Sequence, residues 1–423
     1  MRFSFSLTLR VGVVTWLVAA GAPVASHADT LPLDEALASA EARSPELRAA
    51  QARIDQGRGR RTVAGYVLPS NPTIDLGFKS DVLFENRDEK AFDVGLEQQL
   101  EIFGQRGLRI DVAETELAAR RLELAASQLT VRAAVTVAYF DLMFRERRVA
   151  AFADVVEQAS RLGEAARRRL AAGDIAEAEY QLVAAELVNV RAEARRADAE
   201  RIAAQARLNS LVGRPSANAT VTAGDFPSVA TAAPLDRLLA WAHDRRPEIR
   251  AAAKEAEARS SEVALRQRES LPNPTVGLGY SYDRTLIDGE SQFLGIRLSL
   301  PLPFVRSGRG EIQEARGQRA EAEAKRDGLL ASLDADVATA RARQDETRQR
   351  VLDYAELEGK LGATLQLYEK AYTSGKLDLA EFLAVRDRVL RATFAALEAR
   401  HDAAVAGAEL ELAVGGAYTE VTR

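Results

Sequence analysis

Cysteine is absent from the 423 residues, and methionine and histidine are rare, with two and three copies. Without cysteine the chain forms no disulfide bonds, and we expect no lipid anchor on an N-terminal cysteine. After residue 28, the sequence contains two histidines, His243 and His401, and one methionine, Met143. These three are too few and too scattered for a metal cluster. We therefore expect no resident metal ion and no cofactor.

Catalytic motifs and long apolar runs are also missing. The chain has no GxSxG, no HExxH and no phosphate-binding glycine loop, so we expect it not to be an enzyme. No segment after residue 28 has about 18 consecutive apolar residues, so we expect no membrane-spanning helix. The formal net charge of −5 is small for this length and gives no reason to expect nucleic acid as a partner. The 28% of charged and 6% of aromatic residues favour long helices.

Residues 1–28 have the pattern of a secretory signal peptide. Arg2 and Arg10 precede the apolar stretch 11–20, which is too short to span a bilayer as a helix. Small residues at Ser26 and Ala28 predict cleavage after Ala28. An amphipathic N-terminal anchor is the alternative interpretation. A signal peptide predicts an exported protein.

The rest of the chain consists of two copies of one unit. Pro32 matches Pro234, and the residues around Gly173 match those around Gly375, with the same offset of 202 positions. Between these two matches, the segment LPSNPTIDLGF at 68–78 matches LPNPTVGLGY at 271–280. Three matches in the same order exceed the chance similarity of alanine-rich helices. We place the repeats at 29–213 and 234–423, with a Pro-, Ser- and Thr-rich connector at 214–233.

Helices of two kinds are predicted in each repeat. A helix of about eight turns begins the repeat, at 33–65 and 235–269. A long helical hairpin ends it, at 105–213 and 307–415, with a bend at Gly173 or Gly375. The first long helix would measure roughly 100 Å. Its apolar residues are spaced three, four or seven positions apart, which indicates a coiled-coil seam.

Strict alternation of apolar and polar residues predicts one β-hairpin in each repeat, at 73–101 and 275–301. Ile74, Leu76 and Phe78 share one face of the first strand, whereas its other face is polar or glycine. The strands are about long enough to cross a bilayer at a tilt. The polar faces carry the candidate lumen residues Asp75, Asp93, Glu97 and Arg297.

Four strands are too few for a closed barrel, because small barrels need about eight. An open sheet edge cannot face lipid, so the chain must share strands with copies of itself. Three copies would give a twelve-stranded barrel, whereas two would give about eight strands with an interior that side chains nearly fill. The polar face favours the trimer. A soluble β-sandwich is the alternative, although four strands are too few to build one.

Over nearly all of its length after residue 28, the chain resembles the TolC-like outer-membrane efflux channels, or outer membrane factors. The repeated helix–hairpin–helix–turn–helix unit, the NPT sequence before each first strand and the glycine bends carry the resemblance. The segment QQLEIFGQRGLR at 98–109 is similar to the strand-to-helix junction of the CzcC branch, which serves heavy-metal efflux. The resemblance implies a mainly α-helical homotrimer in the outer membrane of a Gram-negative bacterium. Its twelve-stranded β-barrel would continue into a long periplasmic α-helical barrel.

The resemblance also implies a function and partners. The trimer would be the passive outer-membrane conduit of a tripartite efflux pump. The CzcC-like junction points to heavy-metal cations as the cargo, whereas the channel itself would equally pass drugs or exported proteins. It would contact a periplasmic adaptor (a membrane fusion protein), an inner-membrane transporter of the RND type and outer-membrane lipid. The rival interpretation is an exported coiled-coil scaffold or pump adaptor without a channel.

The resemblance places two functions at the bends. The adaptor would dock at the tips, on Arg169, Leu170, Gly173, Ser374 and Gly375. Alternatively, these are turn residues and solvated arginines. A gate at the closed end would use Asp174, Glu179, Asp378 and Glu381, unless these acids only suit helix N-termini. Family members often place a second acid three residues after the first, where this chain has Leu182 and Ala384. That departure argues against a strong acidic gate.

Overall fold

The computed structural model of the chain describes residues 29–81, 83, 89–285, 289–304, 307–374 and 376–418. The predicted signal peptide at 1–28 and the predicted bend residue Gly375 lie outside the described residues. In the part of the chain that is described, no helix combines the length and the apolarity needed to cross a membrane.

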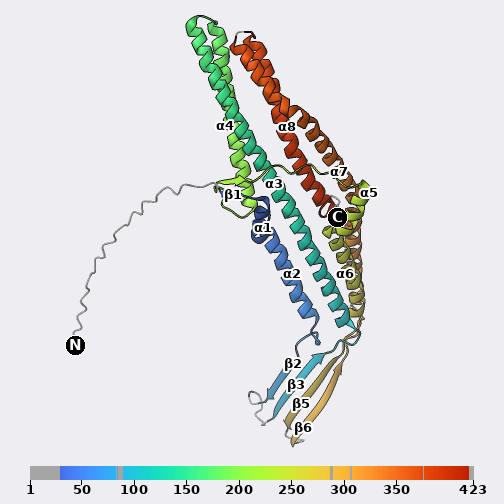
Figure 1. Ribbon diagram of the computed structural model, residues 1–423. Helices are drawn as coiled ribbons and strands as arrows, with labels where there is room; N and C mark the ends of the chain where they lie inside the picture. The colour runs from blue at the N-terminus through green and yellow to red at the C-terminus, as the bar shows by residue number, and fades with distance from the viewer. Residues whose placement is uncertain are drawn as a thin grey trace, which may run out of the picture.

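Two long helical hairpins dominate the described structure (Figure 1). The first is formed by α3 (Gln105–Ala172) and α4 (Glu177–Leu211), and the second by α7 (Arg309–Thr373) and α8 (Leu379–Val414). The 68 residues of α3 correspond to roughly 100 Å of helix. Both bends lie at the same end of the molecule, and the long strands lie at the opposite end (Figure 1).

Four shorter helices lie beside the long ones: α1 (Leu33–Arg43), α2 (Pro45–Ala64), α5 (Leu235–Arg245) and α6 (Pro247–Glu269). The prediction of one continuous helix at 33–65 and at 235–269 is therefore wrong. Ser44 has ψ 124° and Arg246 has ψ 112°, because a following proline disfavours the helical conformation of the residue before it. As a result α1 and α2 pack on α3 as separate segments, and α5 and α6 do the same on α7.

The helix α3 is the central element, since it contacts α2, α4, α6 and α8. The predicted coiled-coil seam on α3 is buried at Val135, Tyr139, Leu142 and Phe152. The ring of Phe152 packs on that of Phe394 from α8 at 4.7 Å between centroids, which joins the two repeats. One apolar cluster surrounds the middle of α3, a second joins α5, α7 and α8, and a third lies next to the bends.

A small parallel sheet of β1 (Asp29–Leu31) and β4 (Thr220–Thr222) lies beside the middle of α3. One of its strands, β4, lies within the predicted connector. The buried hydroxyl oxygen of Tyr139 lies 3.0 Å from the carbonyl oxygen of Leu31 and 2.9 Å from the carbonyl oxygen of Ala223. The backbone N–H of Ala223 donates a hydrogen bond to the Tyr139 hydroxyl at 2.9 Å. Glu146 accepts from the N–H of Thr222 at 3.2 Å. The start of the first repeat and the connector are thereby both attached to α3.

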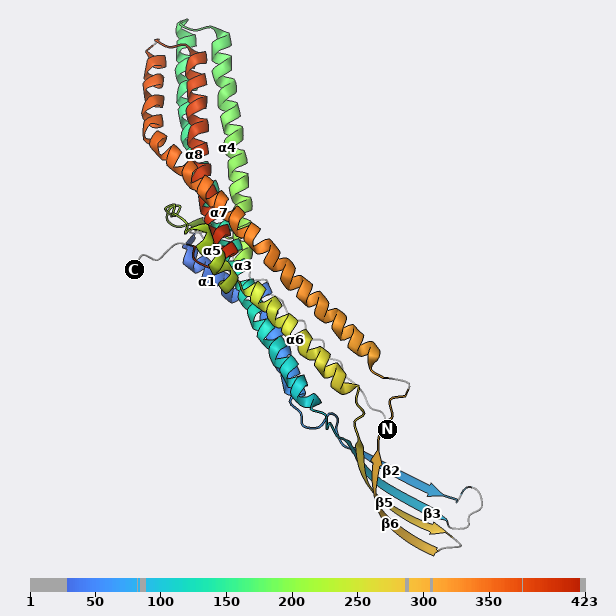
Figure 2. The same ribbon diagram turned by 90° about the vertical axis from the view of Figure 1, so that its right-hand side faces the viewer.

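The four long strands form one antiparallel sheet in the order β2 (Thr73–Ser80), β3 (Lys90–Gln99), β5 (Thr275–Thr285) and β6 (Gly289–Ser299). The central β3–β5 pairing joins the two repeats. The sheet extends beyond the ends of the helices, which leave both of its faces uncovered (Figure 2). Large apolar side chains are consequently exposed, such as Leu76 at 72%, Leu294 at 76% and Ile296 at 82%.

Candidate functional site

The register of the four strands separates an apolar from a polar face. Leu76, Val94, Tyr280 and Leu294 are partners in one row across the sheet and belong to the apolar face. The next row, one residue along each strand, holds Asp75 with three glycines and belongs to the polar face. Because side chains alternate along a strand, every second row lies on the polar side. All four predicted lumen residues lie on this face: Asp75, Asp93, Glu97 and Arg297.

Glu97 and Arg297 form an ion pair that crosses an intervening strand. The two residues lie on β3 and β6, on either side of Gly277 of β5. The Arg297 Nη1 donates to Glu97 Oε1 at 3.1 Å. A Cβ on Gly277 would lie 3.3 Å from Cγ of Glu97 and 3.4 Å from Cβ of Arg297. The glycine thus gives the two long side chains the space to meet above the strand between them.

A row of glycines crosses the middle of the polar face. Gly95, Gly279 and Gly295 are register partners, and Asp75 completes their row on β2. These residues line a hollow on the sheet together with Asp93 and the Glu97–Arg297 pair. Without side chains along the row, the neighbouring carboxylates extend over bare backbone. This arrangement suits a wide aqueous passage better than a packed interior.

The bend between α3 and α4 is closed by Gly173, which has φ 78°. Its N–H donates to the Leu170 carbonyl at 3.0 Å, and the N–H of Asp174 donates to the Arg169 carbonyl at 2.9 Å. A left-handed glycine with two such bonds is a common helix C-terminus. No described atom lies within 4 Å of a Cβ built on Gly173, so the bend is open to a partner.

The helix that follows the second bend, α8, is capped by a side chain. Asp378 caps α8, and its Oδ1 accepts from the N–H of Glu381 at 2.7 Å. The N–H of Lys376 donates to the Ala371 carbonyl at 2.9 Å. Ser374 is exposed beside this bend. Asp378 therefore caps a helix N-terminus, as expected if the acids near the bends only suit helix N-termini.

An open groove between the two bends brings some of the predicted residues together. Arg169, Glu179 and Asp378 all line it, together with Tyr372 and Lys376. The Arg169 guanidinium lies 5.9 Å from the centroid of the Tyr372 ring. Burial raises the pKa of Tyr372, and the charge of Glu179 adds to this increase while Arg169 opposes it. The two other candidate gate residues, Asp174 and Glu381, do not line this groove.

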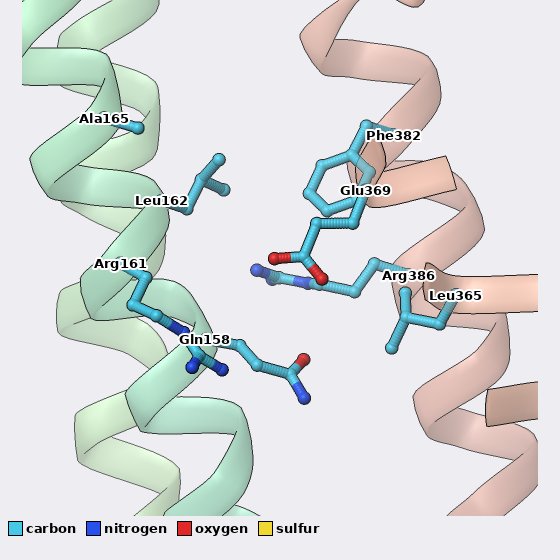
Figure 3. Close-up of a pocket in the computed structure, with 8 residues that line it drawn as sticks. All are labelled: Gln158, Arg161, Leu162, Ala165, Leu365, Glu369, Phe382 and Arg386. Atoms are coloured by element: carbon cyan, nitrogen blue, oxygen red, sulfur yellow. The ribbon is translucent and has the colours of Figure 1, made fainter. Parts of the chain in front are cut away.

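A cavity of about 110 Å³ lies between the hairpins near the bends, and sequence reasoning missed it. In Figure 3 the side chain of Gln158 extends from α3 toward the second hairpin, whose Glu369 and Arg386 side chains extend back toward α3. Arg386 is only 4% exposed and forms an ion pair with Glu186 of α4. This pair links α8 to the first hairpin.

The sequence does contain a signal for Arg386. It follows Leu379 and Phe382 and precedes Val389 at spacings of three and four, all on the buried stripe of α8. A charged residue at a seam position predicts a buried partner, because an unpaired buried charge is very costly. Nothing in the spacing of Glu186 identifies it as that partner, since the contact joins residues 200 positions apart.

Within the described residues, no group of three or more His, Asp or Glu side chains is arranged to hold a metal ion. On the surface, His243 Nε2 is hydrogen-bonded to Asp334 Oδ1 at 2.9 Å. The ring of His401 packs on that of Phe144 at 4.9 Å between centroids. Met143 is buried in the apolar cluster around the middle of α3. His243 thus lies on α5, whereas Met143 and His401 lie on the packed helices α3 and α8.

Comparison with known proteins gives two matches to one family profile, one in each repeat, at residues 36–214 and 238–416. The chain belongs to the outer membrane efflux protein family. Membership confirms the predicted TolC-like fold, which is mainly α-helical with a small β part and an internal repeat. It also confirms the predicted location in the outer membrane, with a long periplasmic helical part. The chain is accordingly the outer-membrane component of an efflux system.

Individual relatives are distant. The cobalt-zinc-cadmium resistance protein CzcC of Cupriavidus metallidurans is 26% identical over 288 residues, which cover 68% of this chain and 66% of that protein. The pyoverdine export outer membrane protein OpmQ of Pseudomonas putida is 27% identical over 405 residues, covering 84% and 82%. The crystal structure of the CmeC outer membrane channel of Campylobacter jejuni superposes with a TM-score of 0.75 at 15% identity, covering 92% of this chain and 87% of that one. This structural likeness shows the fold alone.

Proposed function

We propose that three copies of the chain assemble into a passive conduit through the outer membrane, as part of a tripartite efflux pump. The observation that carries the proposal is the uncovered sheet. Its apolar face is exposed, and its outer strands β2 and β6 each have one edge without a partner in the described chain. Lipid cannot satisfy such edges, so pairing between copies is required.

The dimensions support a barrel of twelve strands. The 11 residues of β5 or β6 would span roughly 36 Å along the strand. At a tilt of about 40° they would cross roughly 28 Å, close to the thickness of the hydrocarbon core. Three copies of four strands give an open pore, whereas two copies would give an interior that side chains nearly fill. The polar face, with its glycine row, would line the pore.

Extraction and conductance test this proposal. The protein should require detergent, migrate as a heat-sensitive trimer on gels and form conducting channels in planar bilayers. The rival function, a soluble coiled-coil scaffold or adaptor, requires a protein that is released with the periplasmic fraction and does not conduct. The exposed apolar face of the sheet favours the channel.

We propose that the tips of the hairpins bind a periplasmic adaptor, which couples the channel to an inner-membrane transporter of the RND type. The first tip contains Arg169, Leu170 and Gly173, and the space around Gly173 is open to a partner. A Gly173→Trp variant should assemble as a trimer but lose adaptor pull-down. Because φ is positive at this position, any side chain strains the backbone, and Gly173→Ala is the matched control: it adds this strain without the bulk of an indole ring. Retained binding by Gly173→Trp would refute docking at this tip.

We propose that acids near the bends favour cations at the periplasmic end. Glu179 and Asp378 share one groove there. Glu381 is exposed next to it on the first turn of α8. A Glu381→Gln variant should lower the cation preference of the reconstituted channel. An unchanged reversal potential would leave Glu381 with its helix-terminus role alone.

We propose heavy-metal cations as the cargo of the channel. We propose no catalytic activity for the chain. The similarity to CzcC and the junction segment at 98–109 support this cargo. The similarity to a pyoverdine exporter shows that the fold serves other cargo as well. Deletion of the gene should sensitise cells to cobalt, zinc and cadmium. Unchanged metal tolerance, together with loss of another export activity, would contradict the cargo and leave the channel in place.

A further inference from the structure

The charges on the polar face of the sheet differ from row to row. In the row of Glu97, Gly277 and Arg297, the two charges are paired at 3.1 Å. At the other end of the strands, Lys79 and Asp283 lie in one row, two strands apart, with opposite charges. Both of these rows are formally neutral.

The two rows between them each carry one carboxylate and no cation. One row is Asp75 with the three glycines, and the other contains Asp93 with Gly77, Ser281 and Phe293. Neither Asp75 nor Asp93 has an ion pair with another described residue. Asp93 extends over Gly77, since its Oδ2 lies 3.0 Å from the position of a Cβ on that glycine. Each copy thus contributes two uncompensated negative charges near the middle of the sheet.

We infer that this section of the lumen favours cations, and that Arg297 is the residue that sets the strength of the preference. The inference rests on the proposed function, because it takes the polar face to be the lumen. Asp75 and Asp93 supply the negative potential. Arg297 limits it, since its guanidinium neutralises Glu97, which would otherwise form a third carboxylate row. A passage with this charge favours cationic over anionic or neutral cargo.

The absence of cysteine allows the potential to be measured at one point in the barrel. Gly279→Cys places a thiol in the glycine row, where Val94 O at 3.8 Å is the only described atom within 4 Å of its Cβ. Asp93, Glu97 and Arg297 are its diagonal neighbours on the adjacent strands, roughly 7 Å away. The reaction rates with a cationic and an anionic methanethiosulfonate report the local charge. Their ratio does not depend on where the channel is narrowest.

Charge variants of the Gly279→Cys protein test the inference in about 0.1 M salt, where screening extends over about 10 Å. Asp93→Asn should lower the ratio of cationic to anionic labelling about two- to threefold, and Arg297→Gln should raise it by a similar factor. The double variant Glu97→Gln with Arg297→Gln should restore the original ratio, because the pair is neutral. Glu290→Gln, which removes a carboxylate from the opposite face, is the matched control and should have no effect.

The outcomes separate the inference from the proposed function. If the channel conducts and the introduced thiol reacts, but neither Asp93→Asn nor Arg297→Gln changes the ratio of cationic to anionic labelling, the inference is overturned. The proposed conduit is then unaffected. If Arg297→Gln lowers the ratio, Arg297 does not limit the potential and the assignment is also wrong. If no conductance is found and the introduced thiol reacts with neither reagent, the polar face is not a lumen and both proposals fail.

Discussion

A lysine at the centre of the apolar face should prevent assembly in the membrane. Leu294 is the sixth of the 11 residues of β6 and is 76% exposed in the single chain. If the strand crosses the bilayer, this position lies close to the midplane. Lysine on the lipid face of a barrel costs about 2–4 kcal/mol at that depth. Since every copy carries the substitution, a Leu294→Lys trimer would lose roughly 6–12 kcal/mol.

The adjacent residue provides a matched control. Gly295 lies at the same depth on the same strand but points to the polar face, where no described atom lies within 4 Å of its Cβ. Gly295→Lys should therefore still assemble, because its ammonium group would be in water. The assay compares the amount of heat-sensitive trimer in the outer-membrane fraction for the two variants. If Leu294→Lys assembles as well as Gly295→Lys, the apolar face does not contact lipid and the reasoning is refuted.

Two further predictions concern the helices. Tyr139→Phe removes a buried hydroxyl that serves three backbone groups, which should cost about 1–3 kcal/mol. Hydrogen exchange should accelerate at 29–31 and 220–223, and unchanged protection there would contradict this role. Arg386→Ala removes a buried side chain and its ion pair with Glu186, whose own side chain is 30% exposed, so local stability near the bends should fall by roughly 1–2 kcal/mol. Arg386→Met with Glu186→Leu should recover most of the lost exchange protection, whereas equal loss in both variants would show that the ion pair is not the cause.

The elements that the sequence predicted well have strong periodic patterns. The long helix expected from about 105 to 172 is found at Gln105–Ala172, because no proline interrupts it and Gly173 ends it. The alternation in the hairpins correctly placed Asp75, Asp93, Glu97 and Arg297 on one face, since a period of two fixes the face of every residue in a strand.

The elements that the sequence did not predict depend on contacts between distant segments. The strands β1 and β4 have only 3 residues each, too few for a pattern, and they are held by Tyr139 from another element. The breaks before Pro45 and Pro247 were missed although proline signals them, because the apolar pattern continues on both sides. The groove at the bends needs residues from both repeats, so spacing within one repeat could not reveal it.

The number of chains in the detergent-extracted particle tests the central claim most directly. Native mass spectrometry of the purified protein measures this number without any assumption about cargo or partners. A sheet of four strands, whose two edges have no partner among the described residues, predicts a particle of three chains that does not separate without denaturation. A stable, water-soluble monomer would contradict the account.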